Sequence, residues 1–246
     1  MVREYYTITE LTREFGISTR TLRFYEDEGL MVVNKPSGIA VHGGSGVAYG
    51  LIEGLRAATG KKYLELVHRI DRDTSGLVMI SKKRSVLKTL QDMLREHKIQ
   101  KTYAAVVKGQ VSLDKQLIDQ PLLRYELANG ERRVRVSKEG KESKTQWNVQ
   151  ERFMHATLVY ASPLSGRTHQ IRVHGLSIGH PLVGDDKYGH ETDYKGPKPR
   201  RLCLHAMRLD IPGYATIEAP LPEDMQSLVA QLRAQKADKP ATTPED

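Results

Sequence analysis

A polar segment at residues 67–76, VHRIDRDTSG, holds the side chains of this chain that are best suited to chemistry. Arg69 stands two positions before Asp71, and the segment lies between two apolar runs at residues 63–67 and 76–80. Loops on a rigid scaffold often carry catalytic residues, so the pattern predicts an active-site loop between two strands, with a reactive carboxylate. A single loop carboxylate is more often a solvated turn residue or a cap, and the segment alone leaves that interpretation open.

Three other segments combine charged, hydroxyl and aromatic side chains: NKPSG at residues 34–38, KTY at residues 101–103, and SGRTHQIRVH at residues 165–174. The histidines of the last segment, His169 and His174, are five positions apart, which does not place them on one helical face. No CxxC or HExxH pattern accompanies them. The sequence therefore predicts no zinc site.

Hydrophobic periodicity and turn signals indicate the elements that must position these segments. Asn129 and Gly130 form a dipeptide typical of a hairpin turn, and Val134 and Val136 alternate with arginines on the return strand. Strands outnumber helices and several are linked by hairpins, so the predicted fold class is α+β. The predicted strands cover residues 30–33, 101–107, 147–149 and 156–160, and the predicted helices cover residues 51–56, 87–94 and 221–232.

Length, composition and charge limit the class of protein but do not identify it. The chain has 246 residues, of which 39% are apolar, and it contains no run of about 18 apolar residues that could span a membrane. A formal charge of +8 favours a polyanionic partner, although a merely basic protein would share this charge. The single cysteine, Cys203, excludes an internal disulfide and fits a reducing cytosol.

The N-terminal residues follow the pattern of a helix-turn-helix. Ile8, Leu11 and Phe15 share one helical face, Gly16 ends that helix, and Ser18 can cap a second one. This segment resembles the opening of a MerR-type transcription regulator. The wing, the following helices and the long dimerisation helix of that family have no counterpart, and a helix-turn-helix without its dimer partner loses half of its operator contacts. DNA binding is therefore doubtful.

Together with the segment at residues 67–76, the three segments above resemble the catalytic domain of the ribosomal large-subunit pseudouridine synthases, the RluA/RluC family. The resemblance implies a mostly antiparallel mixed sheet flanked by helices. It also implies isomerisation of a flipped-out uridine to pseudouridine in 23S-type ribosomal RNA by a cytoplasmic monomer. This reaction breaks the glycosidic bond and re-forms it through C5, without redox change or an outside group, so no cofactor is expected.

The resemblance assigns three catalytic residues. The essential aspartate of the family follows Arg-Leu/Ile, which corresponds to Asp71 and not to Asp73. Arg172 matches the arginine that keeps this carboxylate ionised and oriented, because desolvation alone would raise its pKa. Tyr103 matches the tyrosine that lies against the target base. The alternatives are a surface phosphate contact for Arg172 and a core position for Tyr103.

Three further residues are assigned to substrate binding. Arg69 matches the arginine that fills the gap left by the flipped uridine, with a simple phosphate anchor as the alternative. Arg167 is expected to contact phosphate, and Lys35 belongs to the NKPSG segment. Asp185 and Lys187 lie in another segment shared with the family, and we expect them to be structural partners.

These patterns divide the chain into a MerR-like fragment at residues 1–24, a catalytic domain at residues 25–235, and a disordered tail at residues 236–246. The fragment adjoins the catalytic domain without a linker, which indicates a chimera in which it replaces an S4-type RNA-binding domain. A compositional accident is the alternative. Two other functions remain open: a DNA-binding regulator, supported by residues 5–30 alone, and a non-catalytic RNA-binding module.

Overall fold

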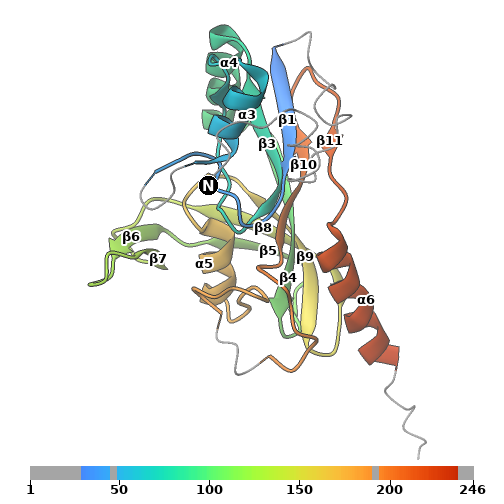
Figure 1. The fold of residues 1–246 in the computed structure, drawn as a ribbon. Helices are drawn as coiled ribbons and strands as arrows, with labels where there is room; N and C mark the ends of the chain where they lie inside the picture. Colours follow the sequence, from blue (N-terminus) through green and yellow to red (C-terminus); the bar gives the residue numbers. More distant parts are fainter. Residues whose placement is uncertain (1–28, 45–48, 190–193, 238–246) are drawn as a thin grey trace, which may run out of the picture. The chain divides into compact units, whose positions relative to one another are not determined.

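The computed structural model describes residues 29–44, 49–189 and 194–237 (Figure 1). The chain divides into two compact units, Met1–Lys101 with His205–Ala219, and Thr102–Leu204 with Pro220–Asp246. The predicted helix-turn-helix lies outside the described residues. No helix within them is long and apolar enough to cross a bilayer.

The first unit is built around β3, which is buried along its whole length. β1 and β2 pair antiparallel with β3, β10 pairs parallel with it, and β11 pairs antiparallel with β10. This mixed sheet carries the predicted active-site loop, which connects β2 to β3. The strands are β1 (Leu30–Lys35), β2 (Glu65–Leu66), β3 (Ser75–Ser81), β10 (Leu204–Asp210) and β11 (Ile217–Glu218).

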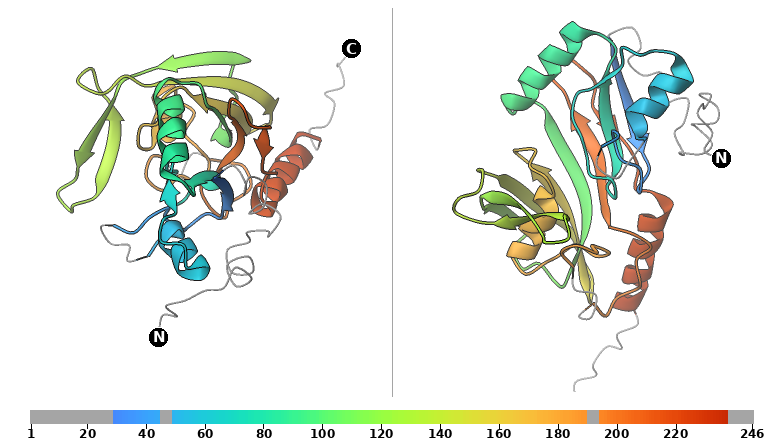
Figure 2. Two further views of the ribbon diagram at one scale, coloured as in Figure 1. Left: turned by 90° about the horizontal axis from the view of Figure 1, so that it is seen from above. Right: turned by 60° about the vertical axis from the view of Figure 1, so that its left-hand side comes forward.

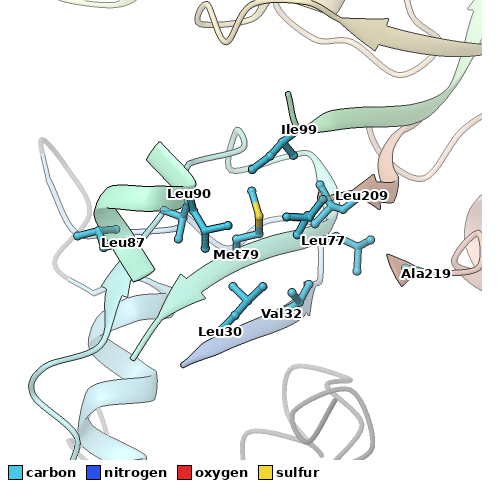
Figure 3. Close-up of a cluster of buried hydrophobic side chains, with 11 residues drawn as sticks. Leu30, Val32, Leu77, Met79, Leu87, Leu90, Ile99, Leu209 and Ala219 are labelled. Atoms are coloured by element: carbon cyan, nitrogen blue, oxygen red, sulfur yellow. The ribbon is translucent and has the colours of Figure 1, made fainter. Parts of the chain in front are cut away.

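Helices cover both faces of β1 and β3, which explains why these strands are apolar runs without alternation. α3 (Leu51–Thr59) and α4 (Arg84–Arg95) lie on opposite sides of the strands (Figure 2). Leu90 of α4 packs in one hydrophobic cluster with Met79 of β3 and Val32 of β1 (Figure 3). Each buried side chain of this size contributes about 1.5–3 kcal/mol, so the cluster fixes the strand that follows the loop.

The second unit contains an antiparallel sheet with the strand order β4-β9-β8-β5 and a separate two-stranded hairpin, β6-β7. Its helices are α5 and α6. The elements are β4 (Gln100–Lys108), β5 (Lys115–Asp119), β6 (Leu122–Glu126), β7 (Arg132–Val136), β8 (Lys144–Arg152), β9 (Ala156–Pro163), α5 (Gln170–Ser177) and α6 (Glu223–Ala237).

The hairpin confirms the turn predicted from its sequence. Gly130 has a φ of +80°, and the side-chain oxygen of Asn129 accepts a hydrogen bond from the backbone N–H of Glu131 (3.0 Å). One face of the hairpin packs through Leu122 and Val134 in a cluster with Val173 and Tyr188. This packing ties the hairpin to α5.

The fold class is α+β, as predicted, and each predicted strand and helix outside the N-terminal segment is present. α5 was not predicted, because its sequence lacks a clear apolar stripe. α6 includes residues 236 and 237 of the segment predicted to be a disordered tail, and the remainder of that segment, residues 238–246, lies outside the described residues.

Candidate active site

The half-buried Asp71 lies in the loop between β2 and β3. Its backbone oxygen accepts a hydrogen bond from the backbone N–H of Thr74 (3.2 Å), which closes a turn just before the buried strand. Asp73 lies in the same turn, and its carboxylate pairs with the exposed side chain of Arg72 (3.3 Å). The loop position predicted for Asp71 is therefore confirmed, whereas its role stays a prediction.

Residues 35–38 hold this loop in place through hydrogen bonds to its backbone. The ammonium group of Lys35 donates to the backbone oxygens of Pro36 (2.8 Å) and Arg72 (2.9 Å). The backbone N–H of Gly38 donates to the same oxygen of Arg72 (2.9 Å), and the hydroxyl of Ser37 donates to the backbone oxygen of residue 73 (2.7 Å). Two segments that the sequence singled out separately thus form one hydrogen-bonded structure. Lys35 is fully buried, which favours a role in holding the loop over a direct phosphate contact.

Two histidines support the ends of the loop. Nε2 of His68 accepts a hydrogen bond from the backbone N–H of Met79 (3.1 Å), so the ring proton of the neutral form must sit on Nδ1. Burial and, to a lesser extent, the positive charge of Lys101 lower the pKa of His68 to about 3, so the ring stays neutral. His205 is buried, and its Nδ1 forms a hydrogen bond with the hydroxyl of Ser75 (2.9 Å). No pattern in the sequence indicated these two supporting contacts.

Arg69 is exposed, and its guanidinium group contacts Nε2 of His42 (3.3 Å). An exposed guanidinium on the active-site loop is compatible with both predicted roles, filling a gap in an RNA stack and contacting phosphate. In the described residues, no group of three or more His, Cys, Asp or Glu side chains could hold a metal ion.

The second unit contains the other predicted residues. Tyr103 lies on β4 opposite Ala161 of β9, and 8% of its surface is exposed. Arg167 is exposed just before α5, and its Nε donates to the backbone oxygen of Glu142 (3.2 Å). Exposure of Arg167 is compatible with a phosphate contact, and burial of Tyr103 is compatible with a position in a dry pocket or in the core.

Arg172 lies on α5 and is 1% exposed, so the alternative of a surface phosphate contact is wrong. Its Nε and one terminal nitrogen donate to the two carboxylate oxygens of Asp185 (2.8 and 2.7 Å), a bidentate ion pair. The same carboxylate accepts hydrogen bonds from the backbone N–H groups of Lys187 (3.0 Å) and Tyr188 (3.1 Å). The prediction that Asp185 is a structural partner is confirmed.

The predicted residues therefore fall into two groups. Asp71, Arg69 and Lys35 lie in the first unit, where hydrogen bonds join Lys35 to the loop that carries the other two. The second unit contains Tyr103, Arg167 and Arg172. The sequence missed the contact between Arg172 and Tyr188 described below, because one chain shows residue types but not which side chains meet.

Comparison with known families identifies two regions of the chain. The family model described as RNA pseudouridylate synthase matches residues 29–177. The model described as MerR family regulatory protein matches residues 7–39, so the two matches share residues 29–39. In the structure, the shared residues contain strand β1 of the first unit.

Proteins named ribosomal large subunit pseudouridine synthase C are about half identical to this chain. That of Haemophilus ducreyi is 49% identical over 221 residues, which cover 86% of this chain and 69% of that protein. That of Escherichia coli K12 is 50% identical over 220 residues, which cover 85% of this chain and 69% of that protein.

Solved structures show the same likeness. Human RNA pseudouridylate synthase domain containing 4 superposes with a TM-score of 0.71 at 25% identity, covering 91% of this chain and 95% of that one. Human RNA pseudouridylate synthase domain containing 1 gives a TM-score of 0.67 at 25% identity, covering 86% and 94%. The chain belongs to the RNA pseudouridylate synthase family.

Proposed function

We propose that this pseudouridine synthase isomerises uridine in 23S-type ribosomal RNA of the large ribosomal subunit. The names of the relatives that are about half identical support this substrate. The formal charge of +8 supports a polyanionic partner. We further propose that the enzyme acts as a monomer in the cytoplasm, where this substrate is found, and that residues 25–235 form its catalytic domain.

The chemistry requires one ionised carboxylate, and we assign it to Asp71. The bond between N1 of uracil and C1′ of ribose breaks and a bond between C5 and C1′ forms. The proton of C5 passes to water and N1 takes up a proton from water, so the product is an isomer of the substrate. The carboxylate either attacks the ribose or the base, or stabilises the detached species. The observation that carries the assignment is that the loop of Asp71 is held in place. Its backbone oxygens accept hydrogen bonds from Lys35, Ser37 and Gly38.

Arg172 and Tyr103 complete the proposed catalytic set. The guanidinium group pairs with Asp185 through two of its N–H groups, and we propose that it also binds the carboxylate of Asp71, as the family resemblance implies. Tyr103 stacks against the target base in this proposal.

Substrate binding is assigned to the two exposed arginines. Arg69 replaces the flipped uridine in the stack, which offsets a cost of roughly a few kcal/mol, and Arg167 contacts phosphate. Lys35 contributes indirectly, because its buried ammonium group orders the loop.

The test is the release of tritium from C5-labelled uridine in ribosomal RNA, followed by mapping of the product sites. Asp71→Asn should eliminate release and leave RNA affinity within severalfold, because asparagine keeps the size and removes the charge. Asp73→Asn is the matched control, since its carboxylate pairs with exposed Arg72 in the same turn, and it should stay active. Retained turnover of Asp71→Asn would refute the assignment. Activity should survive EDTA, and a loss that zinc restores would contradict the cofactor-free mechanism.

A further inference from the structure

Tyr188 contacts Arg172 through the face of its ring. The central carbon of the guanidinium group lies 5.2 Å from the ring centroid, within the range of a cation–π interaction. Tyr188 is 6% exposed and Arg172 is 1% exposed, so water does not screen this contact. The guanidinium group is thus held by Asp185 along one edge and by Tyr188 on one face.

The hydroxyl of Tyr188 is fixed as well. It accepts a hydrogen bond from the backbone N–H of Val134 on β7 (2.9 Å) and forms a second one with Nδ1 of His169 (2.7 Å). The hydroxyl hydrogen is not used in the bond from Val134, so it can be donated to Nδ1 of His169 when the imidazole proton is on Nε2. The two rings meet edge to face, with centroids 5.5 Å apart.

His169 immediately precedes α5 and is three positions before Arg172, so both side chains can face Tyr188. His169 precedes the helix with a φ of +53°, a left-handed conformation that is uncommon outside glycine and costs free energy unless contacts hold it. The hydrogen bond from Tyr188 supplies such a contact. One side chain therefore fixes the start of α5 and the orientation of its buried arginine.

The turn that carries Tyr188 is itself tied to the hairpin. Arg133 donates to the backbone oxygen of Lys187 (2.9 Å), and the ammonium group of Lys187 pairs with the carboxylate of Glu131 (2.9 Å). These bonds leave the phenol ring little freedom to rotate away from the guanidinium group.

We infer that Tyr188 is a positioning residue for catalysis, whose ring holds the Arg172 guanidinium group in its reactive orientation. The inference rests on the proposed catalytic role of Arg172. It assigns different tasks to two parts of one side chain. The ring orients Arg172, and the hydroxyl stabilises the junction of α5 with the hairpin.

Two substitutions separate these tasks. Tyr188→Leu removes the ring and should lower kcat for tritium release by about 10- to 30-fold, as loss of a desolvated cation–π contact predicts, with KM for RNA within about threefold. Tyr188→Phe keeps the ring and should retain kcat within about threefold, with a lower thermal unfolding midpoint because Val134 and His169 lose a hydrogen-bond partner. The matched control is Tyr125→Leu, because Arg135 lies over that ring at 5.3 Å, and its kcat should not change.

Equal losses of kcat in Tyr188→Leu and Tyr188→Phe would overturn the inference, as would wild-type kcat in Tyr188→Leu. If Tyr188→Leu fails to fold, as judged by circular dichroism, two other measurements still test whether the ring positions Arg172. Tyr188→Phe must retain kcat, and the NMR signal of the Arg172 Nε–H group in the wild-type enzyme must show the ring-current shift of a stacked guanidinium. A tenfold loss of kcat in Tyr188→Phe, or no ring-current shift of the Arg172 signal, would overturn the inference. Wild-type and Asp71→Asn enzymes in the same assay test the proposed function separately.

Discussion

Replacement of Asp185 by asparagine should destabilise the protein strongly, because it removes the charge of a buried carboxylate that forms a bidentate ion pair with Arg172. The carboxylate accepts four hydrogen bonds, two from Arg172 and one each from the backbone N–H groups of Lys187 and Tyr188. Both side chains of the ion pair are at most 1% exposed. Asparagine offers one oxygen instead of two, and its amide group turns a donor toward another donor.

The expected loss is about 3–5 kcal/mol of unfolding free energy, the usual cost of removing one partner from a buried ion pair. That is a large part of the roughly 5–15 kcal/mol that stabilise a typical domain. Urea unfolding can be followed through the fluorescence of Trp147, the single tryptophan, which is buried. Asp186→Asn is the control, since its carboxylate lies 3.6 Å from Arg172 but is 78% exposed, and it should cost less than about 1 kcal/mol.

A second variant separates stability from activity. Arg172→Met combined with Asp185→Leu removes both charges, so it should regain part of the stability lost in Asp185→Asn and show no turnover. The gain is partial because the backbone N–H groups of Lys187 and Tyr188 still lose their acceptor. If Asp185→Asn costs no more than Asp186→Asn, or if the double variant remains active, the description of Arg172 as a buried catalytic cation held by Asp185 is wrong.

Three other predictions follow from the structure and the sequence. The pKa of His68 is lowered from 6.5 to about 3 in the folded chain, so the unfolded chain binds the proton first as the pH falls. The contribution of His68 to stability should therefore be complete above pH 6.5 and be lost by up to about 1.4 kcal/mol per pH unit toward pH 3. A His68→Gln variant that kept the wild-type slope in urea titrations between these pH values would contradict this. Gly76→Ala should lower the free energy of unfolding by more than about 3 kcal/mol in the same titrations, because at a φ of +115° its Cβ atom would lie 2.3 Å from the backbone oxygen of Ala206. Gly60→Ala, at a φ of +67° with open space around the Cβ atom, should lower it by about 1–2 kcal/mol. Equal losses in the two variants would show that the close approach at Gly76 does not matter. The whole chain should bind duplex DNA only nonspecifically, with a Kd of roughly 10⁻⁴–10⁻⁶ M at physiological salt, and a submicromolar, sequence-selective gel shift would instead support the regulator alternative.

The sequence determined the features of this protein that depend on neighbouring residues. The loop that carries Asp71 is polar and lies between apolar runs, so its position between two strands could be predicted. The hairpin at Asn129 and Gly130 follows from local turn chemistry, and α3 and α4 follow from the spacing of their leucines. The family could be identified for the same reason, since its motifs are short and contiguous.

Only the tertiary structure decided which distant side chains meet. Lys35 was predicted to bind substrate, yet its amine is buried against the backbone of Arg72, 37 positions away. His68, to which the sequence analysis assigned no role, supports strand β3 through a hydrogen bond from the backbone N–H of Met79. A single sequence cannot show such partners, because long-range packing selects them.

The overlap of the two family matches shows the same limit. Residues 29–39 fit both a regulator and a synthase by sequence, and local propensity does not choose between the two. In the structure, Val32 and Val33 pair with Met79 and Val78 of β3 and are buried on both faces of the sheet. Burial of these apolar side chains against a strand more than forty residues away stabilises the synthase conformation, and that contact exists only in the folded chain.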